Sequence, residues 1–568
     1  MFEQVVTATT ALSLAIGRWA GASCLRATLL VAVVALAAFL PGLASMPPTD
    51  RDEGRYVMAT KQMVETGDYI DIRNQDQPRY KQPAGIYWLQ AAAVHVAGSG
   101  ASSSIGIYRL PSLAGAVLAA LLTIWAFMPL AGRQAAMLGA LLLSGTILLG
   151  VEARIAKTDA VLLATTMLAL GVLIRAFLDP VALRASRLRW VFWVALGIGA
   201  MIKGPIPLLV LLVAAAALSV LARSVRWLGA LQPGRGVLIT LALALPWYIA
   251  IAIRSEGAFF ATALGWNALG KVTEVHQGHG GPPGFYLALL WVTFWPASPF
   301  LLASLGWIWA QRGRREVQVL LCLIVPLWLV FEIVATKLPH YVLPTYPALA
   351  VLVSLALLDM QGLVRGWWSR LAAQGFWIMP VVLAVAGVGA FIWFEGRVPF
   401  TGLLLMLLAI AIGVLATAVS HRSAAAAVPV AVAAALVSWL GTYPMLARAD
   451  TIWLSRSMAV AVQRLAHCEN PQIASAGYRE PSFVFLTRTD TLLTDGDVAA
   501  DFLTEGGCRL AFVDAAPGRR GRPSEEAAFQ ARLAEIGQRA VQLGMVEGRN
   551  MNGGRPRRMG VWRLEPAA

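Results

Sequence analysis

The sequence predicts a polytopic α-helical membrane protein with a C-terminal α/β domain outside the membrane. Of its 568 residues, 58% are hydrophobic and 14% are charged, whereas about a quarter of the residues in soluble domains are charged. Apolar runs of about 20 residues, the length that crosses a bilayer, recur through residues 1–447. Residues 448–568 instead mix polar and apolar positions in short patterns. We therefore expect a membrane domain followed by a small domain in water.

The apolar runs number roughly thirteen, and each is long enough to cross about 30 Å of hydrocarbon. They lie near residues 27–45, 105–130, 134–151, 159–178, 188–202, 205–222, 235–253, 284–308, 317–335, 341–359, 376–394, 401–419 and 425–446. We expect the first run to be retained as a membrane span, because no small-residue cleavage site follows a short apolar core. The shorter apolar segment 84–97 carries Tyr87, Trp88 and His95, which is typical of an interfacial helix.

Arginine clusters between the runs predict the orientation. With a cytoplasmic N-terminus, the cytoplasmic loops hold most of these clusters, as the positive-inside rule requires. The long loop 46–104 and the C-terminal domain would then both lie outside the cytoplasm. The net charge of +15 is explained by these short clusters, so we do not expect a nucleic-acid partner.

The tail carries period-two apolar segments that predict strands at 473–476, 483–486, 510–513, 540–545 and 561–564. Helical patterns occupy 453–466, 496–505 and 524–535 between them. Cys468 and Cys508 both fall in this domain. In an oxidising compartment they could form a disulfide, and two buried free thiols are the alternative.

Loop 46–104 begins with a dense group of acids and bases, Thr49-Asp50-Arg51-Asp52-Glu53-Gly54-Arg55-Tyr56. Thr49 or Asp50 could cap a helix with Asp52 and Glu53 in its first turn, where carboxylates suit the helix dipole. Positions 56, 59, 60 and 63 would form one buried face of this helix. The segment reads either as a catalytic loop or as an ordinary capped loop helix.

Lysine is rare in this chain, since only six of the 46 basic residues are lysine. They are Lys61, Lys81, Lys157, Lys203, Lys271 and Lys337, and all six fall on or near the extracytoplasmic side of the predicted topology. Four of them sit at the ends of apolar runs, where an unpaired charge is costly. Converging ammonium groups would suit a phosphate or diphosphate at the membrane surface, although snorkelling explains any one of them.

Other polar residues near the membrane edge are less informative. Asp159 opens an apolar run and reads as a second site carboxylate or as a helix cap. His276 and His279 lie in a glycine-rich loop with few other metal ligands, so we expect a mobile flap there rather than a zinc site. The sequence implies no cofactor. A divalent metal stays open, although no ligand cluster supports it, and phosphate-loop and dinucleotide motifs are missing.

Several of these segments resemble motifs of bacterial GT-C glycosyltransferases, in the aminoarabinose transferase-like branch related to protein O-mannosyltransferases. The first-loop motifs are Asp52-Glu53-Gly54-Arg55-Tyr56, Glu65-Thr66-Gly67-Asp68-Tyr69, Pro78-Arg79-Tyr80-Lys81-Gln82-Pro83 and Ile86-Tyr87-Trp88-Leu89. The later motifs are Lys157-Thr158-Asp159, Lys203-Gly204-Pro205 and Lys337-Leu338-Pro339-His340-Tyr341. The resemblance covers essentially the whole chain and implies a GT-C fold of about thirteen membrane helices with a periplasmic domain.

The resemblance also implies roles for individual residues. Asp52 matches the catalytic aspartate and Asp159 a second functional aspartate. The groups expected around the donor phosphate are Arg55, Lys203, Lys271, Lys337 and Tyr341, and those expected to bind substrate are Glu53, Tyr80, Lys81, Lys157 and His340. The chain departs from many relatives at Lys81-Gln82-Pro83, where they carry Glu-Lys-Pro, so any metal or acceptor role of that glutamate is in doubt.

The activity implied is transfer of a sugar from a polyprenyl-phosphate donor to an envelope acceptor, a lipid A-like lipid or another glycan. Basic groups would stabilise the departing phosphate. Asp52 would act as general base toward a hydroxyl acceptor, or would orient the reactants if the acceptor is a lipid phosphate. The alternatives are a transporter or flippase of lipid-linked sugars, a protein O-glycosyltransferase of the same fold, and a non-catalytic envelope scaffold. Neither the sugar nor the acceptor can be identified from the sequence.

Overall fold

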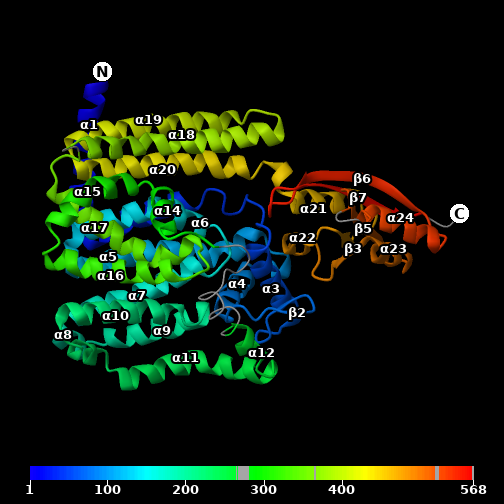
Figure 1. Ribbon diagram of the computed structural model, residues 1–568, viewed down its shortest axis with the longest axis horizontal. Helices are drawn as coiled ribbons and strands as arrows, with labels where there is room; N and C mark the ends of the chain where they lie inside the picture. The colour runs from blue at the N-terminus through cyan, green and yellow to red at the C-terminus, as the bar shows by residue number, and fades with distance from the viewer. Residues whose placement is uncertain (264, 266–279, 364–365, 519–522, 566–568) are drawn as a thin grey trace.

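The computed structural model describes residues 1–263, 265, 280–363, 366–518 and 523–565. Long helices lie side by side, and a small sheet domain stands at one end of them (Figure 1). Eight helices of the described residues are long and apolar enough to cross a membrane, and three further apolar helices are shorter. The polytopic helical fold class is confirmed, while the count of thirteen spans stays a prediction.

The helices from the N-terminus to the middle of the chain are α1 (Phe2–Gly21), α2 (Cys24–Phe39), α5 (Ile105–Gly145), α6 (Ile147–Glu152), α7 (Asp159–Leu178), α8 (Pro180–Ala185), α9 (Leu188–Lys203), α10 (Ile206–Ala222), α11 (Pro233–Arg254) and α12 (Ala258–Phe260). The two runs expected at 105–130 and 134–151 form two helical segments within α5, separated by a kink at Gly132, where φ is +79° and the backbone is not helical. The short helix α6 follows. Glycine permits this left-handed conformation without a Cβ clash.

The later helices are α14 (Phe285–Thr293), α15 (Ser298–Ala310), α16 (Arg315–Ile333), α17 (Tyr346–Asp359), α18 (Trp367–Glu395), α19 (Phe400–Arg422) and α20 (Ala424–Leu446), with the 3₁₀ segment η5 (Pro339–Thr345) before α17. In Figure 1 the N-terminus lies at the end of the bundle away from the sheet domain. The expected flap around His276 and His279 lies outside the described residues.

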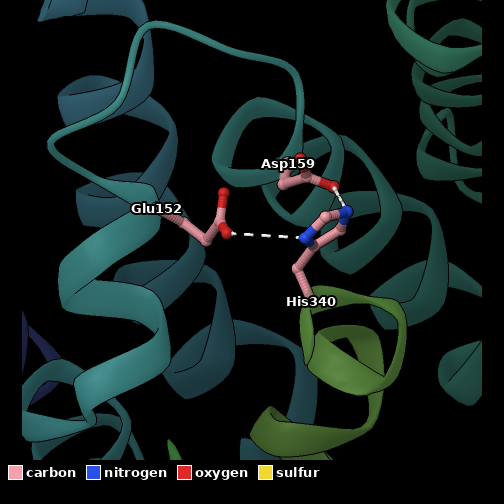
Figure 2. A group of neighbouring side chains, drawn as sticks. All are labelled: Glu152, Asp159 and His340. Carbon is pink, nitrogen blue, oxygen red and sulfur yellow. Dashed lines mark ion pairs between the residues drawn. The ribbon is translucent and has the colours of Figure 1, made fainter. Parts of the chain in front are cut away.

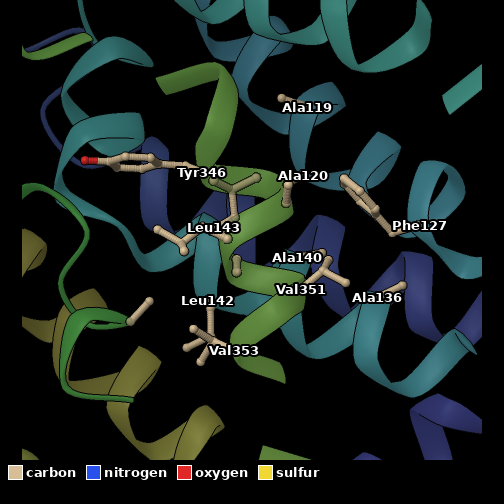
Figure 3. Packing of buried hydrophobic residues seen from close by; sticks show 14 of the residues in the cluster. Ala119, Ala120, Phe127, Ala136, Ala140, Leu142, Leu143, Tyr346, Val351 and Val353 are labelled. Atoms are coloured by element: carbon tan, nitrogen blue, oxygen red, sulfur yellow. The ribbon is translucent and has the colours of Figure 1, made fainter. Parts of the chain in front are cut away.

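Small side chains let the central helices approach closely. Alanines of α5 pack against Val351 and Val353 of α17 in the core (Figure 3). A Cβ at Gly139 would lie 2.7 Å from Val351, and one at Gly115 would lie 2.7 Å from the backbone nitrogen of Val161. Close approach of this kind is how membrane helices gain packing energy without a hydrophobic driving force. It fixes the start of α7 against α5.

The loop after α2 contains α3 (Asp52–Thr66), a hairpin of β1 (Arg73–Asn74) and β2 (Gln77–Pro78), α4 (Gly85–Ala97) and the 3₁₀ turn η1 (Gly100–Ser102). The expected face of α3 is buried at all four positions, Tyr56, Ala59, Thr60 and Met63. The helix expected near 84–97 is confirmed as α4. In Figure 1 α3 and α4 lie at the end of the bundle that faces the sheet domain.

The C-terminal sheet has the order β4-β3-β5-β7-β6, with β3 parallel to β4 and β5 and the remaining pairs antiparallel. Its elements are η6 (Asp450–Ile452), α21 (Leu454–Leu465), β3 (Gln472–Ala476), α22 (Pro481–Leu486), β4 (Leu492–Thr494), α23 (Gly496–Thr504), β5 (Arg509–Asp514), α24 (Glu525–Glu535), β6 (Ala540–Arg549) and β7 (Pro556–Leu564). The α/β prediction is confirmed, and a disulfide joins Cys468 to Cys508.

One predicted strand is wrong. Residues 483–486 belong to helix α22, and the strand on that edge of the sheet is β4. Pro481 starts α22, and proline at the first helical position has the right φ and needs no N–H partner. The apolar run Phe483-Val484-Phe485 is therefore a short buried helix, which periodicity alone does not separate from a strand.

Candidate active site

Helix α3 begins at Asp52, but neither Thr49 nor Asp50 caps it. The N-cap position is Arg51, which has φ +61° and makes no capping hydrogen bond through its side chain. The Glu53 carboxylate instead reaches back and accepts hydrogen bonds from the Thr49 N–H (2.8 Å) and hydroxyl (3.1 Å). The cap prediction was wrong because the carboxylate of Asp50 is engaged by the C-terminal domain, where Ser482 donates to it.

Glu53 is buried in an ion pair with Arg109, at the start of α5. Arg109 donates from Nε (2.7 Å) and Nη2 (2.9 Å) to the two carboxylate oxygens of Glu53, and both side chains are fully buried. The remaining donors of Arg109 bind main-chain carbonyls of Leu43, Met46 and Pro47. Burial disfavours the charge of Glu53, but Arg109 and the neighbouring N–H groups outweigh it and hold its pKa below the ordinary value. The expected substrate contact of Glu53 does not fit this enclosure.

A second group of charges gathers where α6, α7, α9 and η5 meet. Asp159, at the first position of α7, pairs with Lys203 at the end of α9 (2.5 Å) and with Lys157 (3.5 Å). Lys157 also pairs with Glu152 at 3.0 Å. His340 lies between the two acids, 3.8 Å from Glu152 and 3.7 Å from Asp159 (Figure 2). We call these five residues the Asp159 network.

Asp52 lies close to this network. The negative charge of Asp52 contributes to raising the pKa of Lys157, and it makes the same contribution at Arg55 and at Arg79. The same charge also interacts electrostatically with Tyr341. Asp52 is itself exposed, so its carboxylate is open to solvent. The structure therefore brings residues from loop 46–104, the α6–α7 connection, α7, α9 and η5 to one region, namely Asp52, Arg55, Lys157, Asp159, Lys203, His340 and Tyr341.

The other predicted site residues make different contacts or fall outside the described residues. The Lys337 ammonium donates to the carbonyls of Glu332 (2.6 Å) and Val334 (2.9 Å) at the end of α16, and no ion pair with the Asp159 network occurs among the described residues. Tyr80 is buried and donates to Asp71 (2.9 Å). Lys81 is half-buried in the loop between β2 and α4. Lys271 lies outside the described residues.

Glu152, Asp159 and His340 also form a possible metal-ligand group, since their ligand atoms lie within 4.8 Å of one another. Carboxylate and imidazole are suitable ligands for several divalent ions. Here, however, two ammonium groups already contact the same carboxylates, at 2.5 Å for Lys203 and 3.0 Å for Lys157. A metal ion would have to displace both cations, so the donor set fits an ammonium-compensated acid cluster better than a metal centre.

Sequence reasoning missed Arg109, Glu152 and Asp50. A signal existed for Arg109, because it is a lone arginine in an apolar run, and such a residue needs a partner. Glu152 stands just before Arg154, where the pair looks like an ordinary loop. Arg154 is in fact buried, with its guanidinium 3.8 Å from the ring centroid of Tyr443. No local pattern revealed the partner of Asp50.

Comparisons with known proteins agree with this architecture. Residues 94–258 match the family model described as dolichyl-phosphate-mannose-protein mannosyltransferase. An undecaprenyl phosphate-α-4-amino-4-deoxy-L-arabinose arabinosyl transferase of Pectobacterium carotovorum is 27% identical over 379 residues, covering 64% of this chain and 65% of that protein. The corresponding arabinosyl transferase 1 of Pseudomonas fluorescens is 27% identical over 357 residues, covering 61% of this chain and 62% of that protein. The match thus spans slightly less than two thirds of these relatives.

The fold has a close counterpart among solved structures. The crystal structure of ArnT from Cupriavidus metallidurans bound to undecaprenyl phosphate superposes with a TM-score of 0.71 at 18% identity, covering 94% of this chain and 97% of that one. Its apo form gives a TM-score of 0.72 at 17% identity. The motifs of the first loop, the family match and the shared fold agree with one another. The chain is thus a multi-pass membrane protein that shares the fold of ArnT and is similar in sequence to aminoarabinose transferases and, over residues 94–258, to the protein mannosyltransferase family.

Proposed function

We propose that this protein transfers a sugar from a polyprenyl-phosphate donor to a lipid or glycan acceptor at the outer face of the inner membrane. The observation that carries the proposal is the convergence of Asp52 with the Asp159 network, in which Lys157 and Lys203 lie beside Asp159. The relatives are named for the same chemistry, transfer of aminoarabinose from undecaprenyl phosphate.

The charges suit the reaction. As the bond from the sugar to the phosphate breaks, negative charge builds on the departing phosphate oxygen. Lys157 and Lys203, with Arg55 of α3, supply fixed positive charge there, and preorganised charge of this kind usually contributes more to catalysis than any other single effect. Asp159 keeps the two ammonium groups in place. Asp52 then serves as the base toward a hydroxyl acceptor, or orients an acceptor that is already an anion.

The same arrangement supports the proposed orientation. Loop 46–104 and the sheet domain lie at one end of the helices, with the N-terminus at the other (Figure 1). A disulfide in the sheet domain is usual for proteins folded outside the cytoplasm. We therefore place the N-terminus in the cytoplasm and residues 448–568 in the periplasm. The clustering of charge at one end favours transfer over transport, which needs polar sites near the midplane.

The test is mass spectrometry of envelope lipids, glycans and glycoproteins from cells that carry the wild-type protein or Asp52→Asn. We expect one sugar-modified species to disappear in the variant at equal protein level, and the molecule that loses its sugar identifies the acceptor. A modified protein rather than a lipid would select the protein O-glycosyltransferase alternative. Asp76→Asn is the matched control, because Asp76 is an exposed acid on the same loop. Survival of every modified species in Asp52→Asn would refute the proposal.

A further inference from the structure

The C-terminal domain holds a prearranged set of three hydroxyl groups against loop 46–104. Ser455, Tyr478 and Ser482 are buried, and the Ser455 hydroxyl bonds to Tyr478 (2.8 Å) and to Ser482 (2.7 Å). We call them the hydroxyl triad. Its one partner from the membrane part of the chain, among the described residues, is Asp50. Ser482 donates to the Asp50 carboxylate, with Ser455 at 3.4 Å and Tyr478 at 3.5 Å.

Backbone packing adds to this contact. A Cβ built at Gly54 would lie 2.8 Å from the backbone nitrogen of Ser482, so the first turn of α3 touches the main chain of α22 directly. Further along α3, Lys61 donates to the carbonyls of Phe485 (3.0 Å) and Thr487 (3.1 Å) at the other end of α22. Lysine at a helix C-terminus satisfies carbonyls that have no partner in the helix. Helix α3 is thus tied to α22 at both ends.

The opposite side of the same turn is tied to the membrane helices. Glu53 accepts from Arg109 and from the backbone N–H of Ala156 (2.9 Å). Ala156 precedes Lys157, which belongs to the Asp159 network. Asp52 therefore stands between two fixed neighbours, with Asp50 bound to the sheet domain and Glu53 bound to the membrane domain. Arg51 between them has φ +61°, a conformation that non-glycine residues adopt only when the surroundings impose it.

We propose that the hydroxyl triad and Asp50 position Asp52 for sugar transfer, so that the C-terminal domain is a working part of the active site. Ser482 of the C-terminal domain would fix the orientation of the Asp52 side chain at the start of α3. The proposal rests on the proposed function and adds a role for residues 448–568. A misplacement of about 1 Å in a catalytic group can cost about 10²-fold in rate, so a contact that sets the turn has a large effect without touching substrate.

The test uses the full-length protein in lipid nanodiscs with Ser482→Ala. We expect kcat to fall by about 10-fold or more, with the KM for the donor unchanged within about 2-fold, because Asp52 is displaced while the donor site remains. Hydrogen exchange of the amides in residues 49–56 should accelerate. Thr504→Ala is the matched control, since among the described residues the Thr504 hydroxyl donates only to the carbonyl of Asp501 in α23 (2.7 Å). It should change neither kcat nor the exchange of residues 49–56.

A second pair of variants tests the same contact without changing Ser482. Gly54→Ala pushes a methyl group against Ser482 and should reproduce both effects. Gly389→Ala, at a position with no heavy atom within 4 Å, should not. In Ser482→Ala the buried Asp50 carboxylate loses a donor, so adding Asp50→Asn, which removes that charge, should restore part of the lost kcat.

The outcomes separate the two proposals. If Ser482→Ala and Gly54→Ala leave both kcat per folded molecule and the exchange of residues 49–56 unchanged, the positioning role is refuted. A loss of activity that matches only a loss of folded protein also refutes it. If the wild-type protein transfers no sugar, the proposed function fails, whereas slower exchange in wild type than in Ser482→Ala would still show that the domain orders the turn.

Discussion

Two buried charge networks meet at Ala156, whose N–H donates to Glu53 and which precedes Lys157 of the Asp159 network. They differ in how many of their donors and acceptors have hydrogen-bond partners in the protein. The Glu53–Arg109 pair is fully buried, and both carboxylate oxygens of Glu53 accept hydrogen bonds from protein donors. In the Asp159 network the side chains of Lys157 and Lys203 are 14% and 13% exposed to solvent. One oxygen of Glu152 has no partner among the described residues.

The difference separates structural charge from functional charge. A closed network has no capacity for a ligand, because every donor and acceptor is in use. In an incomplete network some charged groups still contact solvent and can exchange a protein partner for a ligand. A phosphate-binding site requires both properties. We therefore expect Glu53–Arg109 to govern stability and the Asp159 network to govern turnover.

The largest effect should follow Arg109→Met. Removing the guanidinium leaves the Glu53 carboxylate buried without its counter-charge, and breaking a buried pair costs about 3–5 kcal/mol. Thermal unfolding of the purified protein should show this loss. Arg314→Met is the control, because its pair with Asp359 is exposed (37% and 44%) and such pairs contribute about 0–1 kcal/mol. Equal unfolding midpoints for the two variants would contradict the comparison.

Asp159→Asn should act on turnover instead. Without this carboxylate the ammonium groups of Lys157 and Lys203 lose their fixed position, and we expect transfer to fall by about 10²–10³-fold. Its unfolding midpoint should shift less than that of Arg109→Met, since water reaches Lys203. The assay is release of free polyprenyl phosphate by purified protein. If the variant unfolded as readily as Arg109→Met and its folded fraction stayed active, the two networks would have exchanged roles.

The pH dependence of stability should report on Asp50, which joins the loop to the sheet domain. Burial, with a smaller contribution from Glu480, raises its pKa from 3.8 to about 6, although Ser482 and Ser455 favour the charged form. The folded state then binds more protons than the unfolded state between pH 4 and 6. Stability should therefore fall as pH rises through this window, by about 1–3 kcal/mol, and level off above it.

Asp50→Asn removes the titration, so its stability curve should be flat relative to wild type between pH 4 and 6. Tyr478 also faces Asp50 but stays neutral in this range, since burial raises its pKa well above 10. Chemical denaturation at fixed pH values gives both curves. An unchanged slope in Asp50→Asn would assign the dependence to other acids.

The smallest effect on stability should come from Glu152→Gln. Lys157 retains its ion pair with Asp159 at 3.5 Å in this variant. The substitution also removes the charge of a buried carboxylate, one oxygen of which has no partner among the described residues. We expect unfolding to change by less than about 1 kcal/mol and transfer to fall only several-fold. Glu53→Gln, measured alongside, should be clearly less stable, because the amide cannot accept all five of the hydrogen bonds that Glu53 receives.

The sequence predicted much of the fold because membrane helices and half-buried strands carry strong periodic signals. The strands β3, β5, β6 and β7 and the helices α21, α23 and α24 followed from local pattern. The wrong strand at 483–486 also has a local cause, because Phe483-Val484-Phe485 is too short for a helical period to be distinguished from that of a strand.

The candidate site was less predictable. Asp159, Lys203, Lys157 and His340 were expected to act near Asp52 and do lie near it, whereas Lys337 binds carbonyls at the end of α16. Sequence reasoning treated Asp52, Glu53 and Asp50 as one acidic cluster. The structure gives them three different surroundings, namely solvent beside the Asp159 network, a closed pair with Arg109, and the hydroxyl triad of the sheet domain.

The sequence by itself determined that this is a membrane protein with rare lysines at helix ends and a separate α/β tail, because hydropathy and periodicity are properties of short stretches. Only the tertiary structure decided which charges are enclosed and which remain open. Burial and pairing depend on residues more than 50 positions apart for Glu53 and Arg109, and more than 400 apart for Asp50 and Ser482. Such partners leave no local pattern, and their energies arise only when folding removes the water between them.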